Sequence, residues 1–290
     1  MSRFRVTRTC LCLIVLLMTV SCSTRIMTVS GELPHGTIHW SGRVNILGDV
    51  LIPRETHIVI EPGTDVVFLP PGDKDFLQEH PNFVGSELIV RGSLVAEGTP
   101  EKPIQFRYVD PDGPVGSWGG VNLMEVPEAR FAFCIFTQSD SALHSQESKV
   151  FIEESIFENN KVGIRFHSSE ILIEHNLIRN NGAGIRFHFG APVICNNRLE
   201  NNAKGLFITS EPRDYHIRNN LFVDNRPYHV VLGEAVVDDV DLKNNSWSDI
   251  ESDNFADSLF DNARDPVLGK VLINPAKSNI ESHAGVSWSL

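Results

Sequence analysis

Two arginines and two histidines recur at a spacing of 21 residues. The motif Gly-Ile-Arg-Phe-His occurs twice, so that Arg165 and His167 return as Arg186 and His188, and His144 precedes Arg165 by the same interval. A guanidinium group binds carboxylate or sulfate through forked hydrogen bonds, and an imidazole adds positive charge at mildly acid pH. In a chain with a net charge of -12, this pattern indicates a site for an anionic ligand. We therefore predict that these five residues bind a ligand.

The same histidines could instead bind a metal ion as a stacked pair. Neither His167 nor His188 has a carboxylate at a fixed local spacing, and the chain has no His-Glu-x-x-His, Cys-x-x-Cys or His-x-His motif. The Asp-x-Asp pairs at 73–75 and 110–112 do not continue into an EF-hand loop, and the acids at 238–241 are typical of an exposed corner. We predict no metal site and no cofactor.

The elements that must position these side chains follow from the repeat. Residues 150–170 align with residues 171–191 without a gap, and a third copy follows at the same spacing. Each copy contains short β-branched or aromatic runs separated by Asn, Gly and acidic turns, and none has a sustained helical period. A leucine-rich solenoid would need Leu at fixed offsets around its Asn, whereas these Asn lie among Ile and Phe. The pattern predicts a parallel β-helix whose coils of about 21 residues stack about 4.8 Å apart.

The first half of the chain alternates in the same way. Its apolar residues fall on even positions, which is the period of a strand with one buried face. The positions predicted to point inward are Val44, Ile46, Val50, Ile52, Ile58, Ile60, Val66, Phe68, Leu88, Val90, Leu94, Ala96, Ile104 and Phe106. Residues 69–85 and 109–117 interrupt the pattern, and we predict that they form long loops that leave the coil and could contribute to a site.

One column of the repeat consists of small polar residues, and it favours a structural explanation over a binding one. Asn tolerates left-handed backbone angles, and its amide can bond to the equivalent amide of the next coil. We predict an inward-facing ladder formed by Cys134, Ser155, Asn176, Asn197, Asn220 and Asn245. Cys134 and Cys195 are nearly three periods apart, about 14 Å along the stack, so we predict that both are free thiols.

Several segments together resemble one protein family. These are the run GRVNILGDVLIPRETHIVIEPGTDVVF, the later runs GSLVAEGTPEKPIQF and SWGGV, the repeats of the form N-x-(I/F)-x-x-N-x-x-G-I, and the closing segment 244–275. They resemble bacterial right-handed parallel β-helix repeat proteins of the NosD-like and pectate-lyase-like superfamily. The resemblance implies an all-β fold, with one right-handed parallel β-helix, and a group that includes carbohydrate-binding and sugar-hydrolysing proteins. These repeats recur across unrelated functions, so the resemblance does not define an activity.

The catalytic motifs of enzymes in that superfamily can be compared with this sequence. A glycosidase needs two carboxylates that face the sugar, and the polygalacturonase-type pattern has NTD, DD, GHG and RIK motifs in order. Only the DD at 238–239 is present, and the arginine repeat has no obvious acids beside it for a calcium-dependent lyase. The sequence therefore favours a non-catalytic protein that binds carbohydrate or another anionic surface ligand. A polysaccharide lyase or glycoside hydrolase with acids from the two loops is the first alternative, and a NosD-like accessory factor for a metalloenzyme or exporter is the second.

The N-terminus resembles a bacterial lipoprotein signal peptide. Three arginines precede an apolar stretch from Leu11 to Val20, and Thr19-Val20-Ser21-Cys22 matches the lipobox except that Thr stands at the usual Leu position. The resemblance implies cleavage before Cys22 and acylation of its thiol, which would anchor the protein in the cell envelope. Ser23 in place of Asp implies the outer membrane, if the host has one.

Charge and composition bound the remaining possibilities. The chain has 25 Lys and Arg against 37 Asp and Glu, which argues against nucleic acid as a partner. We predict an acidic polysaccharide as the partner and membrane contact through the lipid only, whereas the sequence does not specify an oligomeric state. The predicted organisation is a signal peptide at 1–21, a linker at 22–35, one β-helix at 36–275 and a tail at 276–290.

Overall fold

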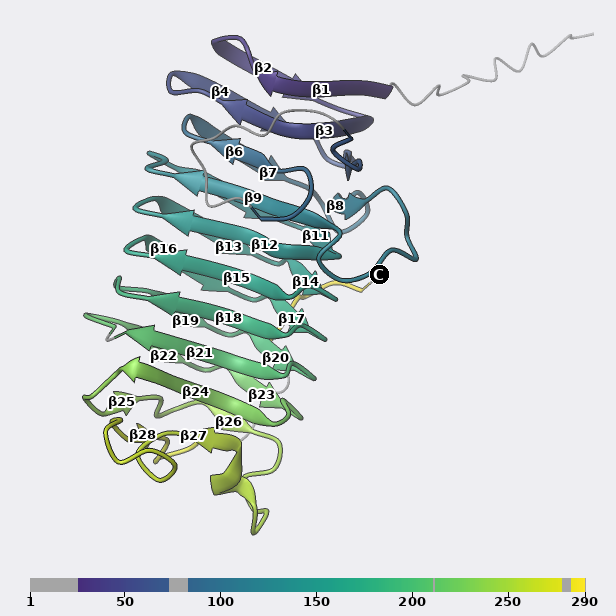
Figure 1. The fold of residues 1–290 in the computed structure, drawn as a ribbon. Helices are drawn as coiled ribbons and strands as arrows, with labels where there is room; N and C mark the ends of the chain where they lie inside the picture. The colour runs from purple at the N-terminus through teal and green to yellow at the C-terminus, as the bar shows by residue number, and fades with distance from the viewer. Residues whose placement is uncertain (1–25, 73–82, 211, 278–282, 290) are drawn as a thin grey trace, which may run out of the picture.

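The chain winds into a stack of parallel coils with three strands in most of them (Figure 1). The computed structural model describes residues 26–72, 83–210, 212–277 and 283–289. It contains about ten turns of about 21 residues, which confirms the predicted all-β parallel β-helix. Each residue pairs in parallel with the residue one turn away, so a column of side chains in the repeat is a column along the axis.

Three faces run along the stack, and each coil crosses them in the order third, second, first. The first face consists of β3 (Arg43–Ile52), β6 (Leu88–Val90), β9 (Trp118–Met124), β12 (Ser139–Gln146), β15 (Val162–His167), β18 (Ala183–His188), β21 (Lys204–Ser210), β24 (Tyr228–Ala235) and β27 (Leu259–Phe260). The start of β3 also begins the second face, which continues through β5 (Asp65–Phe68), β8 (Ile104–Tyr108), β11 (Cys134–Thr137), β14 (Ile156–Glu158), β17 (Leu177–Arg179), β20 (Arg198–Glu200), β23 (Leu221–Val223) and β26 (Ser246–Trp247).

The third face is a separate sheet of eight strands. It consists of β2 (Gly36–Trp40), β4 (Thr56–Ile60), β7 (Ser93–Glu97), β10 (Ala129–Ala132), β13 (Lys149–Glu153), β16 (Glu170–Glu174), β19 (Val193–Cys195) and β22 (His216–Arg218). The elements at the two ends are β1 (Ile26–Glu32), which pairs with β3, the two-stranded pair β25 (Val240–Asp241) and β28 (Val271–Leu272), and the short 3-10 helix η1 (Phe255–Ser258).

The core lies inside the three faces and consists of stacked side chains. Every inward position predicted from the alternation is buried, so that part of the prediction is confirmed. Phe106, Phe136 and Phe157 stack with ring centroids 4.5 and 4.7 Å apart, and Phe166 stacks on Phe187 at 4.6 Å. Stacking of like residues follows from the parallel register, because each coil places the same side chain over its neighbour.

Two ladders of buried amides hold successive corners together. In the first, Asn176 donates from its backbone and side-chain nitrogens to Oδ1 of Asn197, and Asn197 donates in the same way to Asn220. Ser155 and Cys134 extend this ladder, because Cys134 N donates to Ser155 Oγ and Ser155 N donates to Asn176 Oδ1. The second ladder, which the sequence analysis did not identify, consists of Asn160, Asn181, Asn202 and Asn225.

The N-terminal end of the β-helix differs from the predicted boundary. The prediction of a linker at 22–35 is wrong from Ile26 onward, because β1 pairs with β3 in parallel and forms the first strand of the stack. At the other end, the tail returns along the molecule: Gly285 N donates to Asn196 O, and the indole of Trp288 donates to Glu154 O. Trp288 also packs near Phe133, at 6.1 Å between ring centroids.

Other sequence predictions have mixed outcomes. Cys134 and Cys195 are free thiols, as predicted. The loop at 109–117 is held by Gln138, whose amide donates to the carbonyls of Asp110, Pro111 and Gly113. Residues 73–82 of the other loop and the predicted lipidation site Cys22 lie outside the described residues. Within the described part of the chain, no helix is both long and apolar enough to cross a membrane.

Candidate anion-binding site

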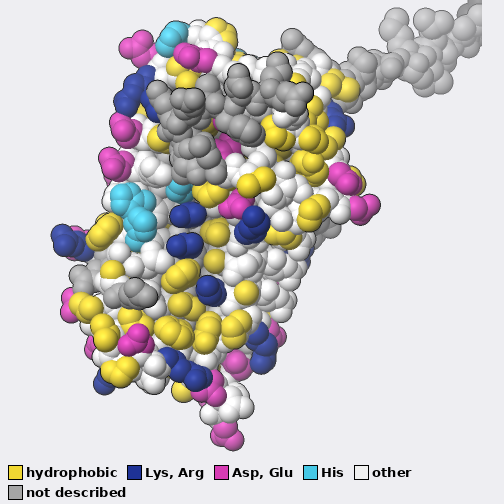
Figure 2. Space-filling view, in the orientation of Figure 1, with side chains coloured by type: hydrophobic (Ala, Val, Ile, Leu, Met, Phe, Trp, Pro, Cys, Tyr) yellow, Lys and Arg dark blue, Asp and Glu magenta, His cyan; other side chains and the backbone are white. Residues whose placement is uncertain are grey.

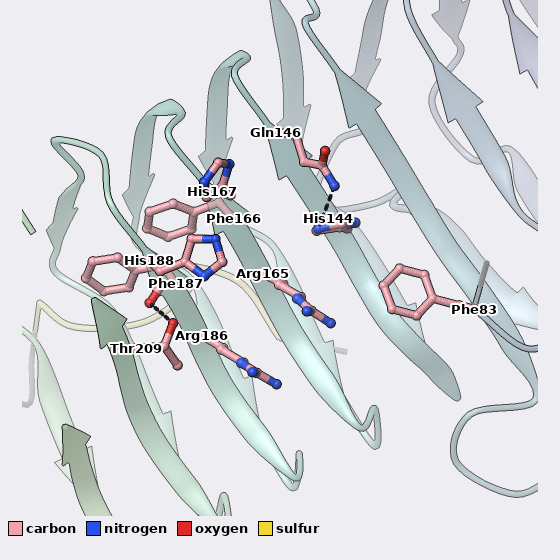
Figure 3. Close-up of a pocket in the computed structure, with 10 residues that line it drawn as sticks. All are labelled: Phe83, His144, Gln146, Arg165, Phe166, His167, Arg186, Phe187, His188 and Thr209. Carbon is pink, nitrogen blue, oxygen red and sulfur yellow. Dashed lines mark hydrogen bonds between the residues drawn. The ribbon is translucent and has the colours of Figure 1, made fainter. Parts of the chain in front are cut away.

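The repeated arginines and histidines lie side by side on the first face. The pairing of β15 with β18 places Arg165 next to Arg186 and His167 next to His188. These side chains line a hollow of about 300 Å³ together with neighbours from adjacent coils and from the segment before β6 (Figure 3). The complete lining is Phe83, His144, Gln146, Arg165, Phe166, His167, Arg186, Phe187, His188 and Thr209. Figure 2 shows Lys, Arg and His side chains gathered over the middle of this face.

Neither arginine of the site forms an ion pair with a carboxylate of the described residues, although the charge of Asp140 acts on Arg165 and partly offsets the lowering of its pKa by burial. Several other arginines are paired with a carboxylate, as in Arg107, whose Nη2 is 2.7 Å from Asp65 Oδ2. Arg165 and Arg186 instead contact aromatic rings: Arg165 lies 5.7 Å from the ring centre of Phe83, and Arg186 lies 5.1 Å from that of Phe207. Burial and the neighbouring Arg186 lower the pKa of Arg165, although a guanidinium remains charged at any physiological pH.

The two imidazoles form a close pair beside the arginines. The rings of His167 and His188 are 4.3 Å apart and meet edge to face at 80°. Burial, followed by the positive charges of His167, Arg165 and Arg186, lowers the pKa of His188 below its ordinary value of 6.5. The ligand-free site therefore favours neutral His188, and an anion in the hollow would oppose that effect.

His144 is the most buried of the five predicted binding residues. It stands beside Arg165 in register, but it is only 5% exposed. The ring of Phe83 meets it edge to face at 5.4 Å, and its Nδ1 lies 3.2 Å from Asn122 Oδ1. Phe83 packs against His144, and both residues line the hollow, so His144 forms an inner wall of it.

A buried carboxyl group lies behind His144, and the sequence analysis did not identify it. Asn122 donates from its amide to Glu87 Oε2 at 2.7 Å and faces His144 with its own oxygen, so it links Glu87 to the hollow. Burial, and next the nearby charge of Asp49, raises the pKa of Glu87 to about 8. Glu87 lies one residue before β6, where only the fold brings it close to Asn122 of β9.

The structure does not bring further predicted ligands together at this site. Within the described ranges, no three His, Cys, Asp or Glu side chains are grouped so that they could hold a metal ion. Asp239, in the acidic corner at 238–241, accepts a hydrogen bond from Lys270 N through Oδ1, which gives it a structural contact. The guanidinium and imidazole N–H groups of the site can therefore donate hydrogen bonds to an anion.

Comparison with known proteins supports the fold and leaves the activity open. Residues 115–247 match the family model of the right-handed β-helix region. No curated protein and no solved structure gives a significant match. The matched segment includes every strand that carries the predicted binding residues, from β12 to β18. The family match and the stacked parallel coils identify the chain as a right-handed parallel β-helix repeat protein.

Proposed function

We propose that the protein is a non-catalytic binding protein for an acidic glycan, such as a uronate polymer. The observation that carries the proposal is the pair Arg165 and Arg186, partly buried and adjacent in register, with no ion pair to a carboxylate of the described residues. Two like charges at one strand spacing repel each other, and carboxylate or sulfate groups of a ligand would relieve that repulsion.

The form of the site supports a polymer as the ligand. Two neighbouring coils carry the same Arg and His, and the coil before them contributes His144, so a polymer with acidic groups along its length can contact several coils at once. Salt should weaken such binding, because part of the site is exposed. Affinity should rise as the pH falls below about 6.5, because a bound anion favours protonated His188.

The test compares two double variants with equal charge changes. Arg165→Ala/Arg186→Ala should weaken binding of polygalacturonate at least ~10-fold in a glycan-binding assay, because two charge-assisted contacts are lost. The control is Arg179→Ala/Arg198→Ala, whose arginines are paired with Glu158 and Glu200 on the second face, and it should bind like the wild type. Equal binding by all three proteins would show that the arginines are only a solvated surface, and no binding by the wild type would remove the glycan proposal.

We also propose that the mature protein is anchored in the cell envelope through an acylated Cys22. The support is the lipobox-like sequence alone. The several acyl chains of a lipoprotein bind firmly to a membrane, whereas one chain binds weakly. Wild-type protein should partition into detergent, and Cys22→Ala should be released or misprocessed. If the variant remains fully membrane-bound, the anchor lies elsewhere.

A second candidate function is a polysaccharide lyase or glycoside hydrolase. The observation in its favour is Glu87, a carboxyl group with a pKa of about 8 that is linked through Asn122 to His144 in the wall of the hollow. A carboxyl that stays protonated near neutral pH can serve as a proton donor. Release of reducing sugar or unsaturated product from uronate polymers, abolished in Glu87→Gln, would support an enzyme. No product from a panel of acidic polymers would favour simple binding.

A further inference from the structure

Phe189 lies against two histidines that line the hollow, and its backbone conformation disfavours a large side chain. It follows His188 directly at the end of β18, and its φ is 54°, in the left-handed region. The equivalent corner residues of the two preceding coils, Glu147 and Ser168, have the same conformation with φ of 46° and 49°. The left-handed conformation is unfavourable for a residue with a Cβ, and Asn or Gly adopts it more readily.

Burial does not compensate for this conformation. Phe189 is 46% exposed, and it is the one aromatic residue among the six exposed large hydrophobic side chains of the described residues. Its ring meets both imidazoles edge to face, with centroids 5.8 Å from His167 and 5.7 Å from His188. The ring is therefore fixed beside the groups that would hold an anion, and part of it remains open to solvent.

We propose that Phe189 is the platform on which the apolar face of a sugar ring rests, so that the site selects an acidic pyranose over an anion without a ring. This inference rests on the proposed function and adds its specificity. A pyranose has one face of C–H groups and an edge that bears its acidic group. The C–H face is attracted by the negative face of a phenyl ring, and the acidic group can then reach the N–H donors of His188 and Arg186.

The arrangement separates two parts of recognition. Arg165 and Arg186 contact negative charge from any source, because a guanidinium binds carboxylate and sulfate alike. Phe189 contributes only when the ligand offers an apolar surface next to that charge. The left-handed backbone is common to this corner of three coils, so what distinguishes Phe189 is an exposed aromatic side chain where Glu147 and Ser168 stand in the preceding coils.

The experiment measures two ligands with the same number of carboxylates by isothermal titration calorimetry. One is a trimer of galacturonate, and the other is a glutamate peptide with three carboxylates and no sugar ring. Phe189→Asn should weaken binding of the galacturonate trimer about 5-fold, the size expected for loss of one aromatic contact, and should leave binding of the peptide unchanged. Phe189→Tyr keeps the ring and should stay within about 2-fold of the wild type for both ligands.

A second measurement separates this role from a structural one. Asn fits the left-handed conformation better than Phe, so the thermal midpoint of Phe189→Asn should be equal to or above that of the wild type. Equal losses for both ligands, or no loss for the trimer, would overturn the platform role while the proposed function stands. If the wild type binds neither ligand, both the proposed function and this inference are wrong.

Discussion

Histidines occupy two different environments in this molecule, one that should favour the charged form when a ligand binds and one that favours the neutral form. At the proposed anion site, His167 and His188 lie beside two arginines, and binding of an anion is expected to favour the charged form of His188. His229, near the C-terminal end of the stack, is 0% exposed and lies between two polar partners. Its Nε2 is 2.7 Å from Asp249 Oδ1, and its Nδ1 faces the amide of Asn225 at 3.2 Å. Since that amide nitrogen donates, Nδ1 accepts, and the neutral tautomer with a proton on Nε2 fits the site.

Stability should therefore depend on pH through His229. Burial lowers its pKa below the ordinary 6.5, although the hydrogen bond to Asp249 opposes this effect. Below about pH 6.5 the unfolded state binds more protons than the folded state, so this contribution to stability is full above that pH and is lost as the pH falls. We predict that the free energy of unfolding decreases between about pH 7 and about pH 5, by at most ~1.4 kcal/mol per pH unit from this one residue.

The measurement is urea unfolding at several pH values for the wild type and for His229→Gln. The variant can accept and donate hydrogen bonds but does not titrate, so its stability should depend less steeply on pH. If both proteins have the same slope, other groups cause the acid sensitivity.

At the scale of the elements, the buried Asn ladders stabilise the corners between strands. Asn197 is fully buried and makes contacts in both directions, accepting from Asn176 and donating to Asn220. Asn197→Ala would leave buried donors and acceptors of two neighbouring coils without partners, each at a cost of about 1–3 kcal/mol. We predict a loss of at least ~3 kcal/mol, measured as a lower thermal or urea midpoint. The control Asn254→Ala removes an exposed amide and should change stability by less than ~0.5 kcal/mol.

The elements also show why the sequence predicted some features and not others. The exact repeat at 21 residues placed Arg165 beside Arg186, because parallel pairing turns a period in sequence into contact in space. The Asn pairs of the repeat were interpreted as turns, although Asn160 and its equivalents form a second ladder in the same period. That ladder could have been found from the repeat by the same reasoning as the first.

Other parts of the site depend on contacts that no periodic pattern contains. His144 is buried because Phe83, from an insertion between coils, packs against it. Glu87 and Asn122 are hydrogen-bonded between neighbouring coils. The turns in this part of the chain differ in length, so the number of residues between Glu87 and Asn122 does not predict the contact. Phe189 follows the second copy of the repeated motif, but its exposure and backbone angle are visible only in the folded chain.

At the scale of the whole molecule, the C-terminal tail contacts a middle coil that is far from it in sequence. Ser287 donates from N and Oγ to Glu154 Oε2, and Trp288 donates to the carbonyl of the same residue. We predict that Trp288→Ala destabilises the middle coils by about 1–2 kcal/mol, because it removes a partly buried ring and a hydrogen bond. Hydrogen exchange should become faster around Phe133 and Glu154. Ser289→Ala, beyond these contacts, is the control, and unchanged exchange in Trp288→Ala would show that the tail only rests on the surface.

The ladders give the stack a direction that its outer shape does not reveal. In each one the amide of a coil donates to the oxygen of the coil that follows, from Asn160 to Asn225 in one column and from Asn176 to Asn245 in the other. The amides are therefore dipoles aligned head to tail, and each polarises the next, so that an inner rung is bound more strongly than an isolated amide pair. The two columns are thus chains of dipoles with the same polarity along the axis, and both ends of each chain are capped. Ser139 and Ser155 donate to the first oxygens, and the last amides donate to His229 Nδ1 and to the carbonyl of Ile217.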